Sequence, residues 1–249
     1  MEKIKHHTII ISDLHLGSPM CQATALLDFL NNIEVKYLIL NGDVFENLKK
    51  TFRLRDSHWK ALDQLRRMSD HCQVVWVKGN HDTLGYMKKR DDIKYIGNLL
   101  GFKIKREFHW EVGLYNYCAI HGDMWDSYIY KYPTLSNIVT WFYDRMKEVN
   151  SEWMKGFTRW IKKKSKILMR NGNYVMEGAF DYAEDRDVHG IFCGHTHKAD
   201  LVERDTIIYG NTGTFESATP TYLSVDSDSV ALWEWEDGKS TLLKKIDLH

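Results

Sequence analysis

The sequence predicts an α/β fold in which a largely buried sheet is flanked by helices. Short apolar runs rich in β-branched and aromatic residues indicate buried strands, among them "HTIII", "VKYLIL" and "CQVVWV". Helical periodicity separates these runs in "MCQATALLDFLNN" (20–32) and "DSHWKALDQLRRMSD" (56–70), where apolar residues recur every three to four positions. Strands that alternate with helices are typical of a sheet covered by helices.

Length and composition fit one folded domain over residues 1–249. Hydrophobic residues make up 43% of the chain and charged residues 27%, which excludes a disordered chain. Lys+Arg and Asp+Glu both number 34, so the net charge of zero leaves only local patches as evidence for nucleic acid or membrane binding. The four cysteines are far apart and form no C-x-x-C pair, which predicts reduced thiols in a cytoplasmic protein.

Two regions depart from the alternating pattern. Residues 126–185 lack strong strand runs and are rich in Trp, Tyr, Lys and Arg, so we expect a helical insertion that forms a cap within the domain. After Gly213 the chain alternates apolar and polar residues, with a turn signal at Asp237-Gly238. This alternation predicts a hairpin, which we expect to belong to a second sheet.

Polar motifs follow five of the predicted strands. They are "SDLHLG", "NGDVFE", "KGNHD", "HGDMWD" and "GHTHK". Functional groups in sheets flanked by helices collect just beyond the carboxyl ends of the strands. The shared placement of the motifs therefore predicts one composite site.

These motifs supply metal ligands. Asp13 and His15 stand two residues apart, so on an extended segment both side chains would point the same way. The full set of predicted ligands is Asp13, His15, Asp43, Asn80, His121, His195 and His197. Nitrogen and oxygen ligands without thiolate suit Mn²⁺, Fe²⁺ or Zn²⁺ and argue against a closed structural zinc site.

Seven ligands are too many for one tetrahedral ion and suit two divalent ions that share a bridging carboxylate. Two metals about 3.5–4 Å apart can lower the pKa of a bridging water and hold a phosphoryl oxygen. The substrate predicted by this chemistry is a phosphate ester or anhydride.

The motifs D-x-H, G-D, G-N-H-D, H-G-D and G-H-T-H, in this order, resemble those of the calcineurin-like metallophosphoesterases over about residues 8–215. The resemblance implies a four-layer αββα double β-sandwich and a dinuclear metal site. It places Asp13, His15, Asp43 and His197 on one metal, and Asp43, Asn80, His121 and His195 on the other. Asp43 would be the bridging ligand.

The same resemblance bears on His81, which follows Asn80 in the G-N-H-D motif. In this family the histidine is not a ligand but faces the phosphate, where it stabilises charge or protonates the leaving oxygen. We expect Asp82 to hydrogen-bond His81 and keep it protonated, so both are predicted catalytic residues. The alternative is that His81 only fills space.

A narrower resemblance suggests the substrate. "SDLHLG", "NGDVFE", "HGDMWDS", the insertion and "GHTHKA…IIYGNTGTFESAT" are similar to UDP-2,3-diacylglucosamine pyrophosphatases and their relatives. Those enzymes cleave a nucleotide lipid of the lipid A pathway into UMP and a lipid phosphate. Three departures stand out: Thr214 replaces the usual Asp, Phe215 the usual Trp, and His81 the Arg of the best-known branch.

The insertion supports a lipid-like substrate on its own terms. Residues 144–170 carry nine basic and three acidic residues, a net charge of +6, interleaved with aromatic side chains. A basic, aromatic, amphipathic helix is typical of membrane interfaces, and the alternative is an ordinary structural cap. We predict that the insertion binds substrate and contacts an anionic membrane through Trp153, Trp160, Lys162, Lys163 and Lys164.

Together these observations predict a cytoplasmic hydrolase, peripheral to the inner membrane, with two divalent metal ions. Manganese is favoured, with iron or zinc as alternatives. Its substrate would be a phosphorylated small molecule or, as the favoured case, a UDP-diacylglucosamine-like nucleotide lipid. Three alternatives stay open: an enzyme for soluble nucleotides, a nucleic-acid-directed enzyme that uses the basic insertion, and a non-catalytic scaffold. The complete ligand set argues against the scaffold, and steep salt dependence would favour nucleic acid.

Overall fold

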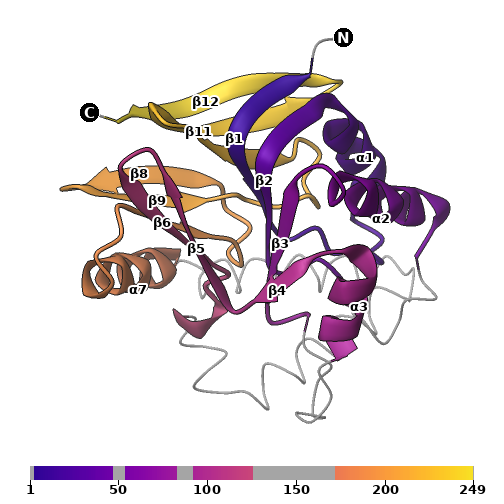
Figure 1. The fold of residues 1–249 in the computed structure, drawn as a ribbon, viewed down its shortest axis with the longest axis horizontal. Helices are drawn as coiled ribbons and strands as arrows, with labels where there is room; N and C mark the ends of the chain where they lie inside the picture. Colours follow the sequence, from indigo (N-terminus) through magenta and orange to yellow (C-terminus); the bar gives the residue numbers. More distant parts are fainter. Residues whose placement is uncertain (1–2, 47–53, 83–91, 126–171, 249) are drawn as a thin grey trace, which may run out of the picture. The chain divides into compact units, whose positions relative to one another are not determined.

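Two β-sheets form the core of the protein (Figure 1), and the computed structural model describes residues 3–46, 54–82, 92–125 and 172–248. The strand order is β12-β11-β10-β1-β2-β3-β4 in the first sheet and β5-β6-β7-β9-β8 in the second. The strands of the first sheet are β1 (Ile4–Ile11), β2 (Ile33–Asn41), β3 (Gln73–Val77), β4 (Lys103–Lys105), β10 (Thr221–Val225), β11 (Ser229–Glu236) and β12 (Lys239–Asp247). Those of the second are β5 (Glu107–Val112), β6 (Tyr115–Ile120), β7 (Gly190–Cys193), β8 (Asp200–Arg204) and β9 (Ile207–Asn211). The helices are α1 (Ala23–Asn32), α2 (Asp56–Met68), α3 (Asp92–Leu100) and α7 (Gly172–Asp185), with a short 3-10 turn η2 (Asp123–Trp125).

The central strands of the first sheet are buried on both faces, as their continuous apolar runs predict. Ile10, Ile39 and Val75 are paired neighbours on the parallel strands β1, β2 and β3, and all three pack against the second sheet. Residues one position away, such as Ile9 and Ile11, belong to a separate core on the opposite face. Successive residues of a strand point to opposite faces, so one apolar run serves both cores.

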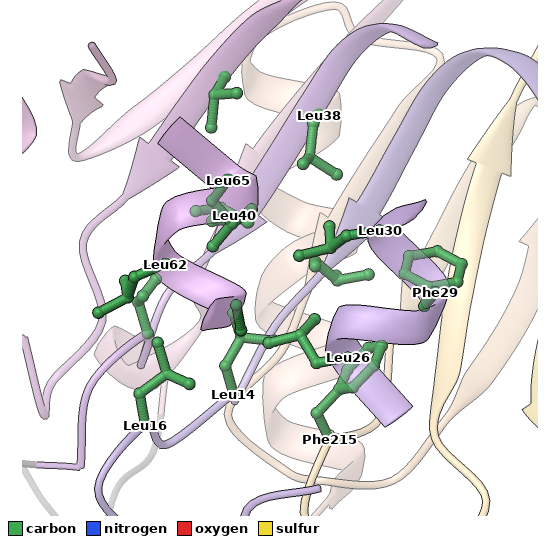
Figure 2. Packing of buried hydrophobic residues seen from close by; sticks show 14 of the residues in the cluster. Leu14, Leu16, Leu26, Phe29, Leu30, Leu38, Leu40, Leu62, Leu65 and Phe215 are labelled. Carbon is green, nitrogen blue, oxygen red and sulfur yellow. The ribbon is translucent and has the colours of Figure 1, made fainter. Parts of the chain in front are cut away.

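The helix-facing core explains the periodicity of the two predicted helices. Figure 2 shows leucine side chains of α1, α2 and β2 packed together on this face. Leu26, Phe29 and Leu30 lie on one side of α1, at the three-to-four spacing seen in the sequence. Burial of side chains of this size contributes about 1.5–3 kcal/mol each, which is enough to hold both helices on the sheet.

The C-terminal strands lie in a different sheet from the one expected. The turn at Asp237-Gly238 is confirmed, with φ of 48° and 77°, and it joins the antiparallel strands β11 and β12. The hairpin nevertheless extends the first sheet, because β10 pairs antiparallel with β1. Alternation indicated which residues are buried, but it could not indicate which sheet edge was available.

The αββα arrangement is confirmed. α1 and α2 pack on one face of the first sheet and the second sheet packs on the other. The Phe180 ring of α7 lies 5.9 Å from that of Tyr209 on β9, whose neighbour Ile208 belongs to the core between the sheets. The carboxyl half of α7 therefore covers the outer face of the second sheet.

The chain divides into two compact units, residues 1–122 with 179–249, and residues 123–178. The insertion predicted over residues 126–185 overlaps the smaller unit, whereas its last seven residues belong to the larger one. Residues 126–171 lie outside the described part of the chain. None of the helices in the described part is long and apolar enough to cross a membrane.

Candidate metal centre and active site

The polar motifs meet where the two sheets end. The predicted ligands follow β1, β2 and β3 of the first sheet and β6 and β7 of the second. Asn41, the last residue of β2, holds these ends together through its side-chain amide, which donates to the carbonyl oxygens of Ile120 at 3.3 Å and Phe192 at 2.9 Å. One buried amide thus fixes the ends of three strands from two sheets.

The loops after β1 and β2 remain paired beyond the strands. The Asp13 amide donates to the Gly42 carbonyl oxygen, and the His15 amide to that of Asp43, both at 3.0 Å. This pairing carries the D-x-H and G-D motifs side by side into the site.

Five predicted ligands have left-handed backbone. The φ angles are 52° for Asp13, 45° for His15, 52° for Asp43, 65° for His195 and 56° for His197. The extended segment expected for Asp13 and His15 is therefore wrong, although their side chains do converge, because β1 ends at Ile11 and the chain coils after it. Left-handed backbone is costly for residues other than glycine and is concentrated at functional sites.

Two motif glycines permit close approach of the ligands. A Cβ atom at Gly42, whose φ is 92°, would lie 2.1 Å from Nδ1 of His121. One at Gly79 would lie 2.2 Å from Oδ1 of Asp43. Both distances are far below van der Waals contact, so both positions require glycine for room, and Gly42 requires it for its backbone conformation as well.

The first group of ligand atoms gathers around Asp13. Nε2 of His197 lies 3.2 Å from Oδ1 of Asp13, and Nε2 of His15 lies 3.8 Å from the same oxygen. The two Nε2 atoms are 3.2 Å apart. One ligand atom from each residue lies within 4.8 Å of the others, which is the convergence that a metal ion requires.

The second group gathers around Asp43. Nε2 of His121 lies 3.3 Å from Oδ2 of Asp43, and one ligand atom each from Asp13, Asp43 and His121 lies within 4.8 Å of the others. Nδ1 of His195 lies 3.0 Å from Oδ1 of Asn80. The His195 amide also donates to Oδ2 of Asp13 at 3.0 Å, which joins this pair to the first group.

The predicted ligands differ in how far they are exposed to solvent. Asp13 and His121 are fully buried and Asp43 is 2% exposed, whereas the His197 side chain is 37% exposed. Buried carboxylates with imidazole neighbours form the floor, so a ligand would enter past His197.

The electrostatics of the site call for positive charge. Burial lowers the pKa of His15, but the hydrogen bond to Glu46 and the charges of Asp43 and Asp13 outweigh it and raise this pKa to about 9. The three carboxylates therefore favour positive charge at this position, which a bound divalent ion would supply in place of the His15 proton, and the nitrogen and oxygen atoms gathered here fit divalent metal ions.

His81 lies beside these groups with one ring nitrogen committed. Its Nδ1 is 3.1 Å from the backbone oxygen of Glu46, which can only accept, so Nδ1 carries the proton. Its amide donates to Oδ1 of Asp43 at 2.8 Å, and its ring stands edge-on to that of His15 at 4.9 Å. Nε2 is consequently the atom of His81 that can gain or lose a proton.

Asp82 does not hold His81, and its predicted catalytic role is not supported. Its carboxylate accepts from the amides of Asp43 (2.9 Å), Val44 (3.0 Å) and Gly79 (3.0 Å) and from the Trp76 indole (2.9 Å). Burial and the neighbouring Asp43 raise the pKa of Asp82 to about 6, so it is still ionised at neutral pH. The residue is 1% exposed and ties the loops after β2 and β3 together.

Two residues of the site were missed in the sequence. Glu46 places a carboxylate oxygen 2.9 Å from Nδ1 of His15, which turns the other ring nitrogen toward Asp13. The backbone oxygen of Asn41 lies 2.9 Å from Nδ1 of His121 and orients that ring in the same way. Both lie in "NGDVFE", but only the tertiary structure reveals which histidine each one supports.

The predicted substrate-binding residues all belong to the insertion. Trp153, Trp160, Lys162, Lys163 and Lys164 lie outside the described residues. Their role in binding substrate or membrane stays a prediction.

Comparison with known proteins agrees with this geometry. Residues 6–199 match the family described as calcineurin-like phosphoesterase. The chain belongs to this family. Members of this family use divalent metals. Family membership and the gathered ligand atoms together indicate a metal-dependent phosphoesterase. No match was found among curated proteins.

Solved structures share the fold at low sequence identity. YfcE, a phosphoesterase from E. coli, is 13% identical with a TM-score of 0.53, over 97% of this chain and 99% of that one. Vps29 from Chaetomium thermophilum is 12% identical with a TM-score of 0.52, over 96% of both chains. A single mutant of Vps29 from Entamoeba histolytica is 16% identical with a TM-score of 0.51, over 97% of this chain and 99% of that one.

Proposed function

We propose that the protein is a dinuclear metal-dependent phosphoesterase that hydrolyses a phosphodiester or pyrophosphate bond. Asp13, His15, Asp43 and His197 would hold one ion, and Asp43 with Asn80, His121 and His195 the other. The observation that carries the proposal is the convergence of two buried carboxylates with imidazole nitrogens at the shared end of two sheets. A scaffold has no use for such a costly arrangement.

The residues have separable tasks in this proposal. Bound divalent ions supply Lewis-acid polarisation of the phosphoryl group and a lowered pKa of water. Oδ1 of Asp43 accepts a hydrogen bond from the His81 amide, and this bond fixes the distance between the ligand cluster and the His81 ring. With Nδ1 committed to Glu46, His81 would donate a proton from Nε2 to the leaving oxygen.

Asp43→Ala tests the dinuclear site. The variant should lose bound metal and most activity toward a nitrophenyl phosphodiester, measured by elemental analysis and hydrolysis rate after loading with Mn²⁺. Asp205→Ala is the matched control, because Asp205 also has left-handed backbone, with φ of 56°, but lies in the turn between β8 and β9. Two ions per chain and normal turnover in Asp43→Ala would exclude the proposed bridge.

His81→Ala tests the proton donor. The variant should keep its metal content and lose about 10²–10⁴-fold in turnover. The loss should be smaller for substrates with good leaving groups, because these need less protonation. Equal losses for good and poor leaving groups would indicate charge stabilisation, and no loss would leave His81 without a catalytic role.

The finer proposal is a nucleotide-linked lipid diphosphate, of the UDP-diacylglucosamine type, as substrate. It is supported by the resemblance of "NTGTFESAT", although Thr214 and Phe215 depart from the usual residues of that branch. This stretch lies against the ligand loop, because the Thr214 hydroxyl donates to the Asp13 carbonyl oxygen at 3.0 Å. Soluble nucleotides are the competing substrate class. A panel of nucleotide lipids, nucleotides and nitrophenyl diesters assayed with Mn²⁺ separates the two.

Variants of the insertion complete this test. Trp153→Ala with Trp160→Ala should raise KM for the lipid substrate by roughly ten- to a hundredfold for each lost contact, since burying a large aromatic contributes about 1.5–3 kcal/mol. Turnover of the nitrophenyl diester should stay near wild type. Equal loss of both activities in a folded variant would make the insertion a structural cap, and loss of neither would favour soluble nucleotides.

A further inference from the structure

The two oxygens of the Asp13 carboxylate have different surroundings. Oδ2 accepts hydrogen bonds from the Ser12 hydroxyl and, at 3.0 Å, from the His195 amide. Oδ1 is buried and has no hydrogen-bond partner among the described residues. It faces Nε2 of His197 at 3.2 Å and Nε2 of His15 at 3.8 Å. The carboxylate therefore presents one oxygen to the imidazole nitrogens, while two donors occupy the other.

The Ser12 hydroxyl has a single proton, and its neighbours decide where that proton points. Three oxygens are within reach: Oδ2 of Asp13, Oγ1 of Thr212 at 2.5 Å and the carbonyl oxygen of Gly213 at 3.4 Å. Only the carboxylate is charged, and a hydrogen bond to a charged acceptor is about twice as strong as a neutral one, so Asp13 accepts the proton. Thr212 must then donate to Ser12. The result is a chain of hydrogen bonds from the Thr212 hydroxyl through the Ser12 hydroxyl to Asp13.

The two hydroxyls of this chain come from different sheets. Ser12 follows β1 of the first sheet, and Thr212 follows β9 of the second. Both residues are buried, so neither hydroxyl is open to a substrate. Among the described residues, the Thr212 hydroxyl is hydrogen-bonded only to Ser12. The alignment of the Asp13 carboxylate thus depends on a contact between the two sheets.

The backbone of Thr212 is held from both sides of this contact. Its carbonyl oxygen accepts from the Thr221 hydroxyl at the start of β10 at 2.6 Å, and its amide donates to the Cys193 carbonyl oxygen at the end of β7 at 3.1 Å. On the other side of Ser12, a Cβ atom at Gly194 would lie 2.4 Å from the Ser12 Oγ. The Ser12 hydroxyl is therefore fixed in place by its packing as well as by its hydrogen bonds.

We propose that Ser12 and Thr212 are positioning residues of the metal centre, which hold Asp13 so that it binds a divalent ion through Oδ1 alone. Hydrogen bonds from residues behind the ligands orient a metal site, and their loss typically costs 10–100-fold in metal affinity. The alternative is a pair of buried hydroxyls that only satisfy each other, but such a pair has no reason to engage one carboxylate oxygen and leave the other without a partner. The inference goes beyond the proposed hydrolysis and rests on it only in that Asp13 binds a divalent ion.

Calorimetric titration of metal-free protein with Mn²⁺ tests the proposal without any substrate. Ser12→Ala removes the donor to Asp13 and should weaken one of the two binding steps by about 10–100-fold. Thr212→Val removes the hydroxyl but keeps the shape of the side chain. It should weaken the same step by about 2- to 10-fold, the effect of one neutral hydrogen bond. Thr212→Ser keeps the hydroxyl and should bind Mn²⁺ as wild type does.

Ser224→Ala is the matched control for the loss of a buried hydroxyl. Ser224 is 1% exposed on β10, and its Oγ accepts from the Trp233 indole at 2.9 Å instead of contacting a ligand. The variant should lower Tm, as Ser12→Ala does, but leave the affinity for Mn²⁺ unchanged. A loss of stability alone therefore cannot imitate the loss of ligand orientation.

Combining Ser12→Ala with Thr212→Val tests the hydrogen-bond chain itself. If Thr212 acts through Ser12, its substitution has no further effect once the Ser12 hydroxyl is gone. The double variant should then bind Mn²⁺ like Ser12→Ala alone. Losses that multiply would show that the two hydroxyls act independently and would overturn the proposal.

Other results would also overturn it. One is wild-type affinity in a folded Ser12→Ala variant, and another is an equal loss of affinity in Ser224→Ala. If Ser12→Ala does not fold, the comparison of Thr212→Val with Thr212→Ser decides, and equal affinities of these two would refute the proposal. Wild-type protein that binds no divalent ion would refute the proposed function and this inference with it, whereas the other results leave the proposed function intact.

Discussion

Replacing Asp82 with Asn separates a structural role from a catalytic one. The side chain keeps its size but has one acceptor oxygen in place of two, while donors from Asp43, Val44, Gly79 and Trp76 all point at it. Whichever way the amide turns, its NH₂ group faces at least one buried N–H. The change should therefore loosen the junction between the loops after β2 and β3.

The magnitude follows from the four bonds of 2.9–3.0 Å. Hydrogen bonds to a charged group contribute about 1.5–3 kcal/mol and neutral ones about 0.5–1.5, while an unsatisfied buried donor costs about 1–3. Relief of the repulsion between Asp82 and Asp43 offsets part of the loss. We expect a net destabilisation of about 3–5 kcal/mol, a large share of the 5–15 kcal/mol of a typical domain.

The assay is thermal unfolding of metal-free protein, followed by metal content and turnover. At this chain length about 3–5 kcal/mol lowers Tm by roughly 6–20 °C. Asp63→Asn, which breaks only a surface ion pair with Arg67, is the control and should shift Tm by no more than about 2 °C.

One outcome would refute the structural reading. If Asp82→Asn melts like wild type, yet shows the same dependence on the leaving group as His81→Ala, Asp82 acts through His81 after all. Loss of stability with ordinary leaving-group dependence supports the structural role.

Three further perturbations give sharp expectations. Glu46→Gln should weaken metal affinity by about 10–100-fold, because it disturbs the orientation of His15. Calorimetric titration measures this affinity, and an unchanged value would show that the contact between Glu46 and His15 does not affect metal binding. Gly42→Ala should abolish metal binding, as its Cβ would collide with His121, and a metal-loaded, active variant would contradict this. Burial raises the pKa of Asp226, but hydrogen bonds outweigh this and lower it below 3.8, so its stabilisation is present above about pH 4 and is lost as pH falls through the folded pKa. In urea unfolding, the deficit of Asp226→Asn relative to wild type should shrink at acidic pH, and a constant deficit would show that the carboxylate charge is irrelevant.

The sequence by itself determined the five strands that precede the polar motifs, the two N-terminal helices and the residues that meet in the site. Apolar runs indicated the buried strands, and the polar motifs at their ends located the ligands, because both signals are local in the chain. The turn at Asp237-Gly238 was equally readable, since it depends on two adjacent residues.

Only the tertiary structure decided which sheet each strand joins and which groups each polar side chain of the site is hydrogen-bonded to. β10 to β12 extend the first sheet because the edge of β1 was available, and no alternation pattern carries that information. Asp82 follows His81 directly, yet it bonds to loops that the chain reached some forty residues earlier. Hydrogen-bond partners are chosen by proximity in space, so the neighbour in the sequence was the wrong partner and the distant backbone was the right one.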